Sequence, residues 1–495
     1  MSTIDIERFD SVYIKLNCDN STAQELSDYF TFMVPGAQFT PAFRSKFWDG
    51  KIRLFNVNNK LLYAGLYDYV SQFAKERNYD VNYKSDFAAE EFSLSEAEQF
   101  IKKLNPTLEP RDYQVSAFVH AVRRKRALLL SPTASGKSFI IYLLMRYYNE
   151  RTLIVVPTTT LVHQLCSDFK SYGYDSDSQV HKIFSGQEKD PGKQITITTW
   201  QSIYKMPKKW FDQFGVVIGD EAHLFKAKSL TSIMTKLTDC QYRFGFTGTL
   251  DGTQTHKLVL EGLFGRVFKV TTTSELIEKK QLADFMIKCL VLNYSDETKK
   301  IVRGKTYHEE IEWIVLNNDR NRFIKNLAIS LEGNTLLLFQ FVEKHGKVLY
   351  NMISDACSQD RKVFFVHGGV EGEERDQIRK IVEHEKNAII IASYGTFSTG
   401  INIPSIANII FTSPSKSRIR NLQSIGRGLR LSDNKIRTVL YDIADDLQWK
   451  STKNHTILHF HERIKIYNEE KFQYKLYSLK LKEAQVQPPP GRVIP

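Results

Sequence analysis

Short apolar runs that alternate with longer helical segments from residue 108 onward are the feature that most constrains the fold. Runs as apolar as these are typical of strands covered on both faces, and their alternation with helices implies a parallel sheet. The first group of runs begins at Ala127, Leu153, Ile195, Val216 and Tyr242. A second group begins at Thr335, Val363, Ala388, Ile409 and Thr438. We therefore predict two consecutive α/β domains, with a charged bridge after Lys269.

The flanking segments have different patterns. Alternating apolar and polar residues predict strands at 11–16 and 51–55, and residues 22–32 predict a helix with Ser21 as its N-cap. Residues 450–495 are helical in pattern and basic, since nine Lys or Arg exceed four Asp or Glu by five. We predict four parts: an N-terminal α+β nucleic-acid-binding domain (1–95), two parallel-sheet domains (96–290 and 291–445), and a basic helical extension with a tail (446–495).

The charge balance favours a polyanionic partner. The 495 residues carry 68 basic and 56 acidic side chains, a formal net charge of +12, and Lys and Arg displace counterions from phosphates. A solvated basic surface is the alternative. The five cysteines lack the spacing of a zinc site or a disulfide framework, which predicts buried thiols. The N-terminus is unlike a signal peptide and no apolar run approaches the ~20 residues of a membrane span, so we expect a cytoplasmic protein without a membrane partner.

A phosphate-binding loop follows the first apolar run. Residues 131–138 read Ser-Pro-Thr-Ala-Ser-Gly-Lys-Ser between a predicted strand and a predicted helix. Backbone N–H groups at a helix N-terminus bind phosphates, which predicts contacts of ATP with Pro132, Thr133, Ala134, Ser135 and Gly136. Lys137 is expected to reach the β- and γ-phosphates, and Ser138 to bind Mg²⁺. Ser131 stands where this motif usually has its first glycine.

Two adjacent carboxylates end the fourth run, in the sequence Gly-Asp-Glu-Ala-His over 219–223. The carboxyl ends of strands in open α/β sheets are where ligands bind. We expect Asp220 to hold Mg²⁺ and Glu221 to orient and deprotonate the attacking water. His223 either couples this site to neighbouring motifs or packs as a core residue.

Arg111 and Gln114 lie just before the phosphate loop, in Pro-Arg-Asp-Tyr-Gln over 110–114. A guanidinium and an amide can hydrogen-bond an adenine edge and stack on it. Both residues are therefore adenine candidates, with structural contacts as the alternative.

The second α/β domain contributes Gln423, Arg427 and Arg430. The two arginines are three residues apart, so both can lie on one face of a helix. We expect them to stabilise transition-state charge on the γ-phosphate as arginine fingers. A basic helix face that grips DNA phosphates is the alternative.

Hydroxyl-rich segments follow several of the apolar runs. Hydroxyls and backbone N–H groups contact phosphates without reading sequence, and their recurrence in both domains predicts a nucleic-acid track. Its candidate residues are Pro157, Thr158, Thr198, Thr199, Trp200, Thr399 and Gly400. Thr247-Gly-Thr is expected to connect the hydrolysis site to this track, or else to form a simple turn.

Basic and aromatic residues interleave near the N-terminus, a composition that suits nucleic acid. The basic candidates are Arg44, Lys46, Lys51 and Arg53. They surround Phe43, Phe47 and Trp48, of which some must belong to the core. We predict an auxiliary domain that binds duplexes or junctions.

The ordered set of motifs over residues 108–445 resembles that of superfamily 2 helicases. A closer resemblance, to phage UvsW-type recombination helicases, extends to residues 43–54, 207–215, 304–311 and 392–400. It implies two RecA-like motor domains, ATP and Mg²⁺ as cofactors, and 3′-to-5′ movement. It further implies a monomer or weak oligomer acting on forks, Holliday junctions and R-loops, including RNA–DNA hybrids, in recombination, replication and repair.

Three alternatives stay open at this point. An RNA helicase shares the same motor, because none of the motifs reads a 2′-OH. A restriction-type DNA translocase shares it too, although we find no nuclease constellation in the sequence. A non-enzymatic annealing or binding protein would explain the basic N-terminal domain and tail, but not Lys137, Asp220, Glu221 and Arg427 together.

Overall fold

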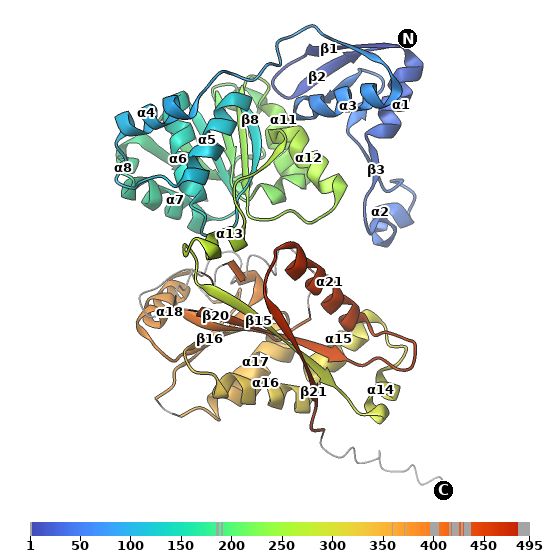
Figure 1. Cartoon of the computed structure of the whole chain (residues 1–495), viewed down its shortest axis with the longest axis vertical. Helices are drawn as coiled ribbons and strands as arrows, with labels where there is room; N and C mark the ends of the chain where they lie inside the picture. Colours follow the sequence, from blue (N-terminus) through green and yellow to red (C-terminus); the bar gives the residue numbers. More distant parts are fainter. Residues whose placement is uncertain are drawn as a thin grey trace. The chain divides into compact units, whose positions relative to one another are not determined.

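The computed structural model describes residues 2–184, 188–189, 192–358, 360–370, 372–396, 405–414, 417, 425–426, 429 and 437–483. The chain forms two compact units, Met1–Thr271 and Thr272–Pro495 (Figure 1). Among the described helices, none is both long and apolar enough to cross a membrane. The five cysteines are free thiols, of which Cys166, Cys240 and Cys289 are buried.

The first unit begins with a small α+β domain. Its five-stranded sheet has the order β5-β6-β2-β1-β7, with helices α1 (Asn20–Tyr29) and α3 (Tyr67–Arg77). The strands are β1 (Thr3–Arg8), β2 (Tyr13–Asn17), β5 (Phe55–Asn56), β6 (Leu61–Tyr63) and β7 (Asp80–Tyr83). The predicted N-cap was wrong: Asp19 caps α1 because its carboxylate accepts a hydrogen bond from the Thr22 N–H at 2.9 Å, and Ser21 lies inside the helix.

A small projection interrupts this domain, and we call residues 31–53 the lobe. It consists of strands β3 (Thr31–Met33) and β4 (Lys51–Arg53), which pair only with each other, together with η1 (Ala37–Phe39) and α2 (Pro41–Arg44). In Figure 1, β3 and α2 lie apart from the strands β1 and β2 of the same domain.

The first sheet domain contains seven parallel strands in the order β10-β11-β9-β12-β13-β8-β14. Five of them coincide with the predicted apolar runs: β8 (Arg126–Leu130), β9 (Thr152–Val156), β11 (Ile195–Thr199), β12 (Val216–Gly219) and β13 (Tyr242–Thr247). The edges are β10 (Val180–Ile183) and β14 (Val267–Lys269). The helices are α4 (Leu94–Leu104), α5 (Asp112–Arg124), α6 (Lys137–Tyr148), α7 (Thr159–Ser171), α8 (Ser176–Gln179), α9 (Trp200–Ile203), α10 (Lys208–Phe211), η3 (Ala222–Lys226), α11 (Lys228–Lys236) and α12 (Gln254–Phe264).

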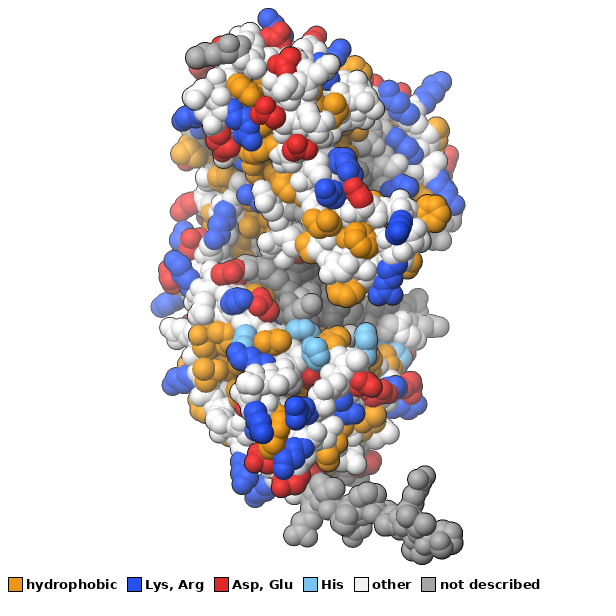
Figure 2. Space-filling model, turned by 90° about the vertical axis from the view of Figure 1, so that its right-hand side faces the viewer, with side chains coloured by type: hydrophobic (Ala, Val, Ile, Leu, Met, Phe, Trp, Pro, Cys, Tyr) orange, Lys and Arg blue, Asp and Glu red, His pale blue; other side chains and the backbone are white. Residues whose placement is uncertain are grey.

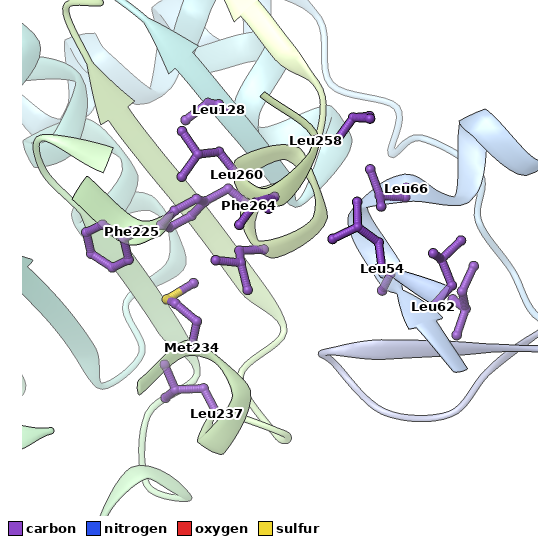
Figure 3. Packing of buried hydrophobic residues seen from close by; sticks show 14 of the residues in the cluster. Leu54, Leu62, Leu66, Leu128, Phe225, Met234, Leu237, Leu258, Leu260 and Phe264 are labelled. Atoms are coloured by element: carbon purple, nitrogen blue, oxygen red, sulfur yellow. The ribbon is translucent and has the colours of Figure 1, made fainter. Parts of the chain in front are cut away.

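The N-terminal domain and the first sheet domain share one hydrophobic cluster. Leu54 and Leu66 from the former belong to the same buried group as Leu258 and Phe264 from the latter (Figure 3). The backbones also approach closely, because a Cβ at Gly65 would lie 2.0 Å from a carbonyl oxygen of α12. Burial of apolar surface on both sides therefore fixes the N-terminal domain to the first sheet domain.

The second unit contains another seven-stranded parallel sheet, in the order β17-β18-β16-β19-β20-β15-β21. The predicted runs form β16 (Asn334–Phe339), β17 (Val363–Val366), β18 (Ile389–Ser393), β19 (Ile406–Phe411) and β20 (Arg437–Asp446). Its helices are α13 (Thr273–Glu278), α14 (Asp296–Val302), α15 (Tyr307–Leu316), α16 (Asn318–Ser330), η4 (Val342–Gly346), α17 (Lys347–Ser354), α18 (Gly372–His384) and α21 (His455–Glu469). The prediction of two parallel-sheet domains is confirmed.

Two strands of this sheet were not predicted. β15 (Asp284–Asn293) lies in the expected charged bridge, so that the boundary predicted at residue 290 falls inside it. β21 (Tyr474–Lys480) follows α21 within the segment expected to be helical, and it pairs with β15 along the sheet edge. The described part of the C-terminal segment is thus built into the second sheet domain.

Buried charges attach α21 to the sheet. The Arg463 Nε donates to one carboxylate oxygen of Asp442 at 2.9 Å, and its Nη2 lies 2.8 Å from the other in an ion pair, with the two side chains 2% and 0% exposed. Tyr467 donates to the same carboxylate at 2.8 Å. Burial alone would lower the pKa of Arg463, but Asp442 raises that pKa above its ordinary value. At the other end of α21, the buried Glu310 carboxylate accepts from the Thr456 N–H at 2.8 Å and so caps the helix.

Replacing Arg463 with Met should destabilise the second unit by about 3–5 kcal/mol, because the Asp442 carboxylate would stay buried without its counter-charge. Chemical denaturation measures this as a fall in the free energy of unfolding. Lys465→Met on the same helix is the matched control, since Lys465 forms an exposed ion pair with Glu462 and should contribute less than ~1 kcal/mol. Equal stability of the two variants would contradict a structural role for the buried pair.

Candidate nucleotide-binding and catalytic site

Three neighbouring strands of the first sheet domain carry the predicted ATP motifs at their carboxyl ends. The order β12-β13-β8 places the phosphate loop after β8 beside the segment after β13, and the two carboxylates after β12. The Ser131 N–H donates to the Thr247 carbonyl at 2.8 Å, which joins two of these segments directly. Because all strands are parallel, the sheet brings the three motifs to one edge.

The phosphate loop contains two residues in the left-handed backbone conformation, which glycine adopts easily and alanine does not. Ala134 and Gly136 have φ values of 67° and 78°, and a Cβ at Gly136 would lie 2.3 Å from the Gln114 Nε2. The hydroxyls of Ser131 and Ser135 lie 2.6 Å apart, and Ser135 also donates to the Pro132 carbonyl. Helix α6 begins at Lys137, so its first unpaired N–H groups adjoin the loop.

The carboxylate pair lies opposite the loop lysine. The Lys137 Nζ is 3.9 Å from a Glu221 carboxylate oxygen, and the Glu221 N–H donates to the Asp220 carboxylate at 2.9 Å. Burial and the neighbouring Glu221 raise the pKa of Asp220 to about 6, whereas Lys137 opposes the shift. Glu221 has a φ of 49° at the end of β12, a backbone conformation that is uncommon outside glycine and common at functional sites.

His223 connects the carboxylates to the segment after β13. Its Nδ1 lies 3.3 Å from Glu221 and 3.0 Å from the Thr247 hydroxyl. The Thr247 hydroxyl donates to the Thr249 carbonyl at 2.9 Å and is therefore positioned to accept from His223. The ring of His256 contacts the His223 carbonyl at 2.9 Å. Sequence reasoning missed His256, since a single histidine on a helix carries no spacing signal.

Gln114 contacts the phosphate loop directly, and Arg111 is connected to the loop through Tyr113. The Gln114 amide donates to the Ser135 and Gly136 carbonyls at 3.1 and 3.2 Å, and its side chain is 2% exposed. Arg111 donates to the Tyr113 hydroxyl, which in turn donates to the Ser135 carbonyl at 2.9 Å. In this structure both residues therefore stabilise the loop.

The track candidates of the first sheet domain gather at the other half of the same edge. β11 and β9 are neighbours, and Thr199 pairs with Val156, so Pro157 and Trp200 follow adjacent strand ends. Thr158 accepts from the Leu161 N–H as the N-cap of α7. Thr198 is fully buried and Thr199 donates to or accepts from Ser202 at 2.9 Å. Only a minority of these hydroxyls is thus open for a phosphate, and backbone groups are the better candidates.

Several predicted residues fall outside the described part of the chain: Gln423, Arg427, Arg430, Thr399 and Gly400. The structure therefore places the first unit's half of the predicted site. Within that half, the donor set fits Mg²⁺–ATP. Lys137 supplies a cation, Asp220 a carboxylate and Ser138 a hydroxyl, which lies 2.8 Å from the Tyr172 hydroxyl. Like His256, Tyr172 is a residue near the site that the sequence did not reveal.

Models of three protein families match the chain. The model described as DNA helicase UvsW, N-terminal, matches residues 3–84. The model described as type III restriction enzyme, res subunit, matches residues 107–252, and the helicase conserved C-terminal domain matches residues 319–432. These matches cover the N-terminal domain and both sheet domains in turn.

One similarity extends over nearly the whole chain. The sequence is 35% identical to the ATP-dependent DNA helicase uvsW of Enterobacteria phage T4, over 97% of this chain and 100% of the relative. The chain belongs to the UvsW family of DNA helicases. A crystal structure of T4 UvsW matches with a TM-score of 0.52 at 34% identity, over 97% of this chain and 99% of that one. The DNA 3'-5' translocase XPB2 of Sulfurisphaera tokodaii is 25% identical over 66% of this chain and 80% of the relative.

Membership of the UvsW family confirms the predictions of an ATP-dependent DNA helicase and of two RecA-like domains. The chain is an enzyme that uses ATP and binds DNA. The family resemblance inferred from the motifs is confirmed as well. Three of the named motifs, those at Ser131, Asp220 and Thr247, meet at one sheet edge.

Lys137→Ala should abolish ATP hydrolysis in this UvsW-family helicase, because the point charge expected at the β- and γ-phosphates is lost. The variant should fold, since side-chain hydrogen bonds of Ser131, Ser135 and Gln114 hold the loop. Phosphate release in the presence of single-stranded DNA measures the effect, with Lys170→Ala on the exposed face of α7 as the control. Hydrolysis near the wild-type rate would show that the loop assignment is wrong.

Glu221→Gln should separate nucleotide binding from chemistry. The amide keeps the size of the side chain but cannot accept the proton of the attacking water, so kcat should fall roughly 10²-fold or more. ATP-dependent DNA binding should persist, and a gel-shift assay with and without ATP checks it. Unchanged turnover would refute the role of Glu221 as the general base.

Proposed function

We propose that this helicase acts on branched DNA, with replication forks, Holliday junctions and R-loops as its substrates in recombination, replication and repair. The observation that carries the proposal is the basic lobe of the N-terminal domain. The N-terminal domain itself shares a hydrophobic cluster with the first sheet domain. A motor that remodels a branch needs a second contact beyond the strand along which it moves. The similarity to the ATP-dependent DNA helicase uvsW of phage T4 supports DNA as the substrate, and the branched forms of DNA are what the resemblance of the motifs implies.

The chemistry follows from the arrangement of the chain's own side chains. Mg²⁺, when bound with ATP, supplies charge that neutralises the phosphates. Ser138 and Asp220 are the residues that would hold the ion, and Lys137 would contact the terminal phosphates. Glu221 orients and deprotonates the attacking water. His223 lies between Glu221 and Thr247, so it is positioned to report a change at the hydrolysis site to the segment after β13.

Gln423, Arg427 and Arg430 complete the proposed catalytic set. Their support is the sequence spacing, which allows both arginines to lie on one helix face. We assign the arginines to stabilisation of transition-state charge on the γ-phosphate. We assign Arg111 and Gln114 to binding of the adenine. To contact the base, Arg111 would give up its hydrogen bond to the Tyr113 hydroxyl.

The DNA track is proposed to follow the carboxyl ends of β9 and β11. Pro157, Thr158, Thr199 and Trp200 lie there, and the backbone N–H groups of these segments suit phosphates without reading sequence. Thr198, Thr399 and Gly400 are retained as candidates from the sequence. This kind of contact makes movement along DNA independent of its base order.

Three exposed cations of the lobe lie outside its ion pair. Arg44, Lys46 and Lys51 are exposed, and none of them forms an ion pair among the described residues. Arg53 differs, because its guanidinium donates to the Asp49 carboxylate at 2.5 Å. The first three are therefore the stronger candidates for duplex phosphates, and Arg53 serves first to hold the lobe together.

The proposal is tested with the variant Arg44→Ala/Lys46→Ala/Lys51→Ala. Fork regression and junction affinity should fall, and the slope of log affinity against log salt should become shallower by about 0.9 for each lost phosphate contact. ATPase activity stimulated by single-stranded DNA should stay near wild type, because the lobe lies outside the hydrolysis site. The control Lys75→Ala/Lys84→Ala removes two exposed lysines of the same domain outside the lobe.

Two results would contradict different parts of the proposal. A triple variant that regresses forks as well as the wild type, with an unchanged salt slope, overturns the role of the lobe as the second DNA contact. A wild type that fails to act on forks and junctions while hydrolysing ATP on single-stranded DNA overturns the branched-DNA function itself.

A further inference from the structure

The lobe is a small structure with its own hydrogen bonds. The Val34 N–H donates to the Gly50 carbonyl at 2.8 Å, and the Trp48 N–H donates to the Ala42 carbonyl at 3.1 Å. The Trp48 indole donates to the Lys51 carbonyl at 2.9 Å. Thr40 caps α2 through its hydroxyl. These bonds give the turn between α2 and β4 a defined conformation.

The aromatic residues of that turn divide into two groups. Phe43 packs against Gly50, whose added Cβ would lie 3.0 Å from the Phe43 ring, and Trp48 is half-buried. Phe47, between Lys46 and Trp48, is 92% exposed. Lys46 has a φ of 59°, so the backbone reverses immediately before Phe47. Phe43 and Trp48 therefore hold the lobe together, and Phe47 takes no part in its core.

Exposed apolar side chains are concentrated in the lobe. A single exposed hydrophobic residue is ordinary on a protein surface. However, the two most exposed large hydrophobic side chains of the described chain, Phe47 and Phe39, both lie within residues 31–53, at 92% and 70%. Met33, also in the lobe, is 54% exposed. This concentration has no explanation in the packing of the lobe.

The charges beside Phe47 indicate what covers it. Arg44, Lys46 and Lys51 are exposed cations within a few residues of the ring. Figure 2 shows hydrophobic side chains intermixed with Lys and Arg on the side of the molecule that it presents. Cations attract phosphates, and an exposed aromatic ring stacks on a base that has lost its partner. Paired bases inside a duplex do not offer such a face, whereas a branch point does.

We propose that Phe47 stacks on an unpaired base at the branch point of the DNA, while Arg44, Lys46 and Lys51 hold the adjacent phosphates. This inference rests on the proposed action on branched DNA and names the residue that recognises the junction itself. The ring acts as a wedge, because a base stacked on Phe47 is withheld from re-pairing with its complement. Since the N-terminal domain shares its hydrophobic cluster with the first sheet domain, the wedge is anchored to a domain of the motor.

The test compares Phe47→Ala, Phe47→Leu and Phe47→Trp in the full-length protein. Removal of one base-stacking contact should weaken affinity for a fork roughly 5- to 150-fold, and fork regression should fall with it. Phe47→Trp should retain both, because it keeps an aromatic face, whereas Phe47→Leu should resemble the alanine variant. Phe9→Ala is the matched control, since Phe9 is a 60% exposed phenylalanine of the same domain outside the lobe.

A fork with 2-aminopurine at the branch point reports stacking directly. Wild type and Phe47→Trp should quench its fluorescence, and Phe47→Ala and Phe47→Leu should not. The salt slope should stay unchanged in all Phe47 variants, because no phosphate contact is lost. This separates the wedge from the basic residues, whose replacement changes the slope.

The outcomes distinguish the two proposals. A wild type that does not act on forks overturns the branched-DNA function itself. A wild type that regresses forks, with Phe47→Ala equal to it, overturns the wedge alone. A Phe47→Leu variant that matches wild type also overturns stacking, because leucine has no aromatic face. Unchanged thermal denaturation, expected for so exposed a side chain, confirms that the variants are folded.

Discussion

The parallel arrangement of strands in the first sheet domain is the constraint on which the candidate site depends. Because every strand of this sheet runs in the same direction, the segments after β8, β12 and β13 meet at one edge. Hydrogen bonds then fix the local geometry, with Ser131 bound to Thr247 and His223 between Glu221 and Thr247. The remaining half of the edge, after β9 and β11, is left for the DNA track. One sheet thereby places hydrolysis and DNA contact side by side.

Burial joins the smaller parts of the chain to the two sheets. The N-terminal domain is fixed by a shared hydrophobic cluster and by the close approach of Gly65 to α12. The C-terminal segment is fixed by β21, which extends the second sheet, and by the ion pair of Arg463 with Asp442. A buried ion pair adds little net stability but strongly penalises any arrangement that separates the charges. It therefore specifies where α21 packs.

The sequence predicted most of the strands and the carboxyl-end motifs, because buried parallel strands are nearly continuous apolar runs. It did not predict β15, in which Lys288 and polar ends interrupt the apolar pattern. It also did not predict β21, an edge strand whose residues are mostly exposed, Lys475 and Lys480 among them. The N-cap of α1 was placed at Ser21 instead of Asp19, since both residues suit a cap and only the backbone distinguishes them. His256 and Tyr172 carry no motif and were recognised only through their contacts.

The sequence by itself determined the class of the protein, because the residue types and order of the phosphate loop and the Asp-Glu pair are required by ATP chemistry on any parallel sheet. Tertiary structure decided which neighbouring side chains serve that chemistry and which serve the fold. In the lobe, for example, Arg53 is paired with Asp49, and Phe47 is exposed while Phe43 packs inward. The physical reason is that burial and pairing depend on contacts between residues distant in the chain, which a local pattern does not contain.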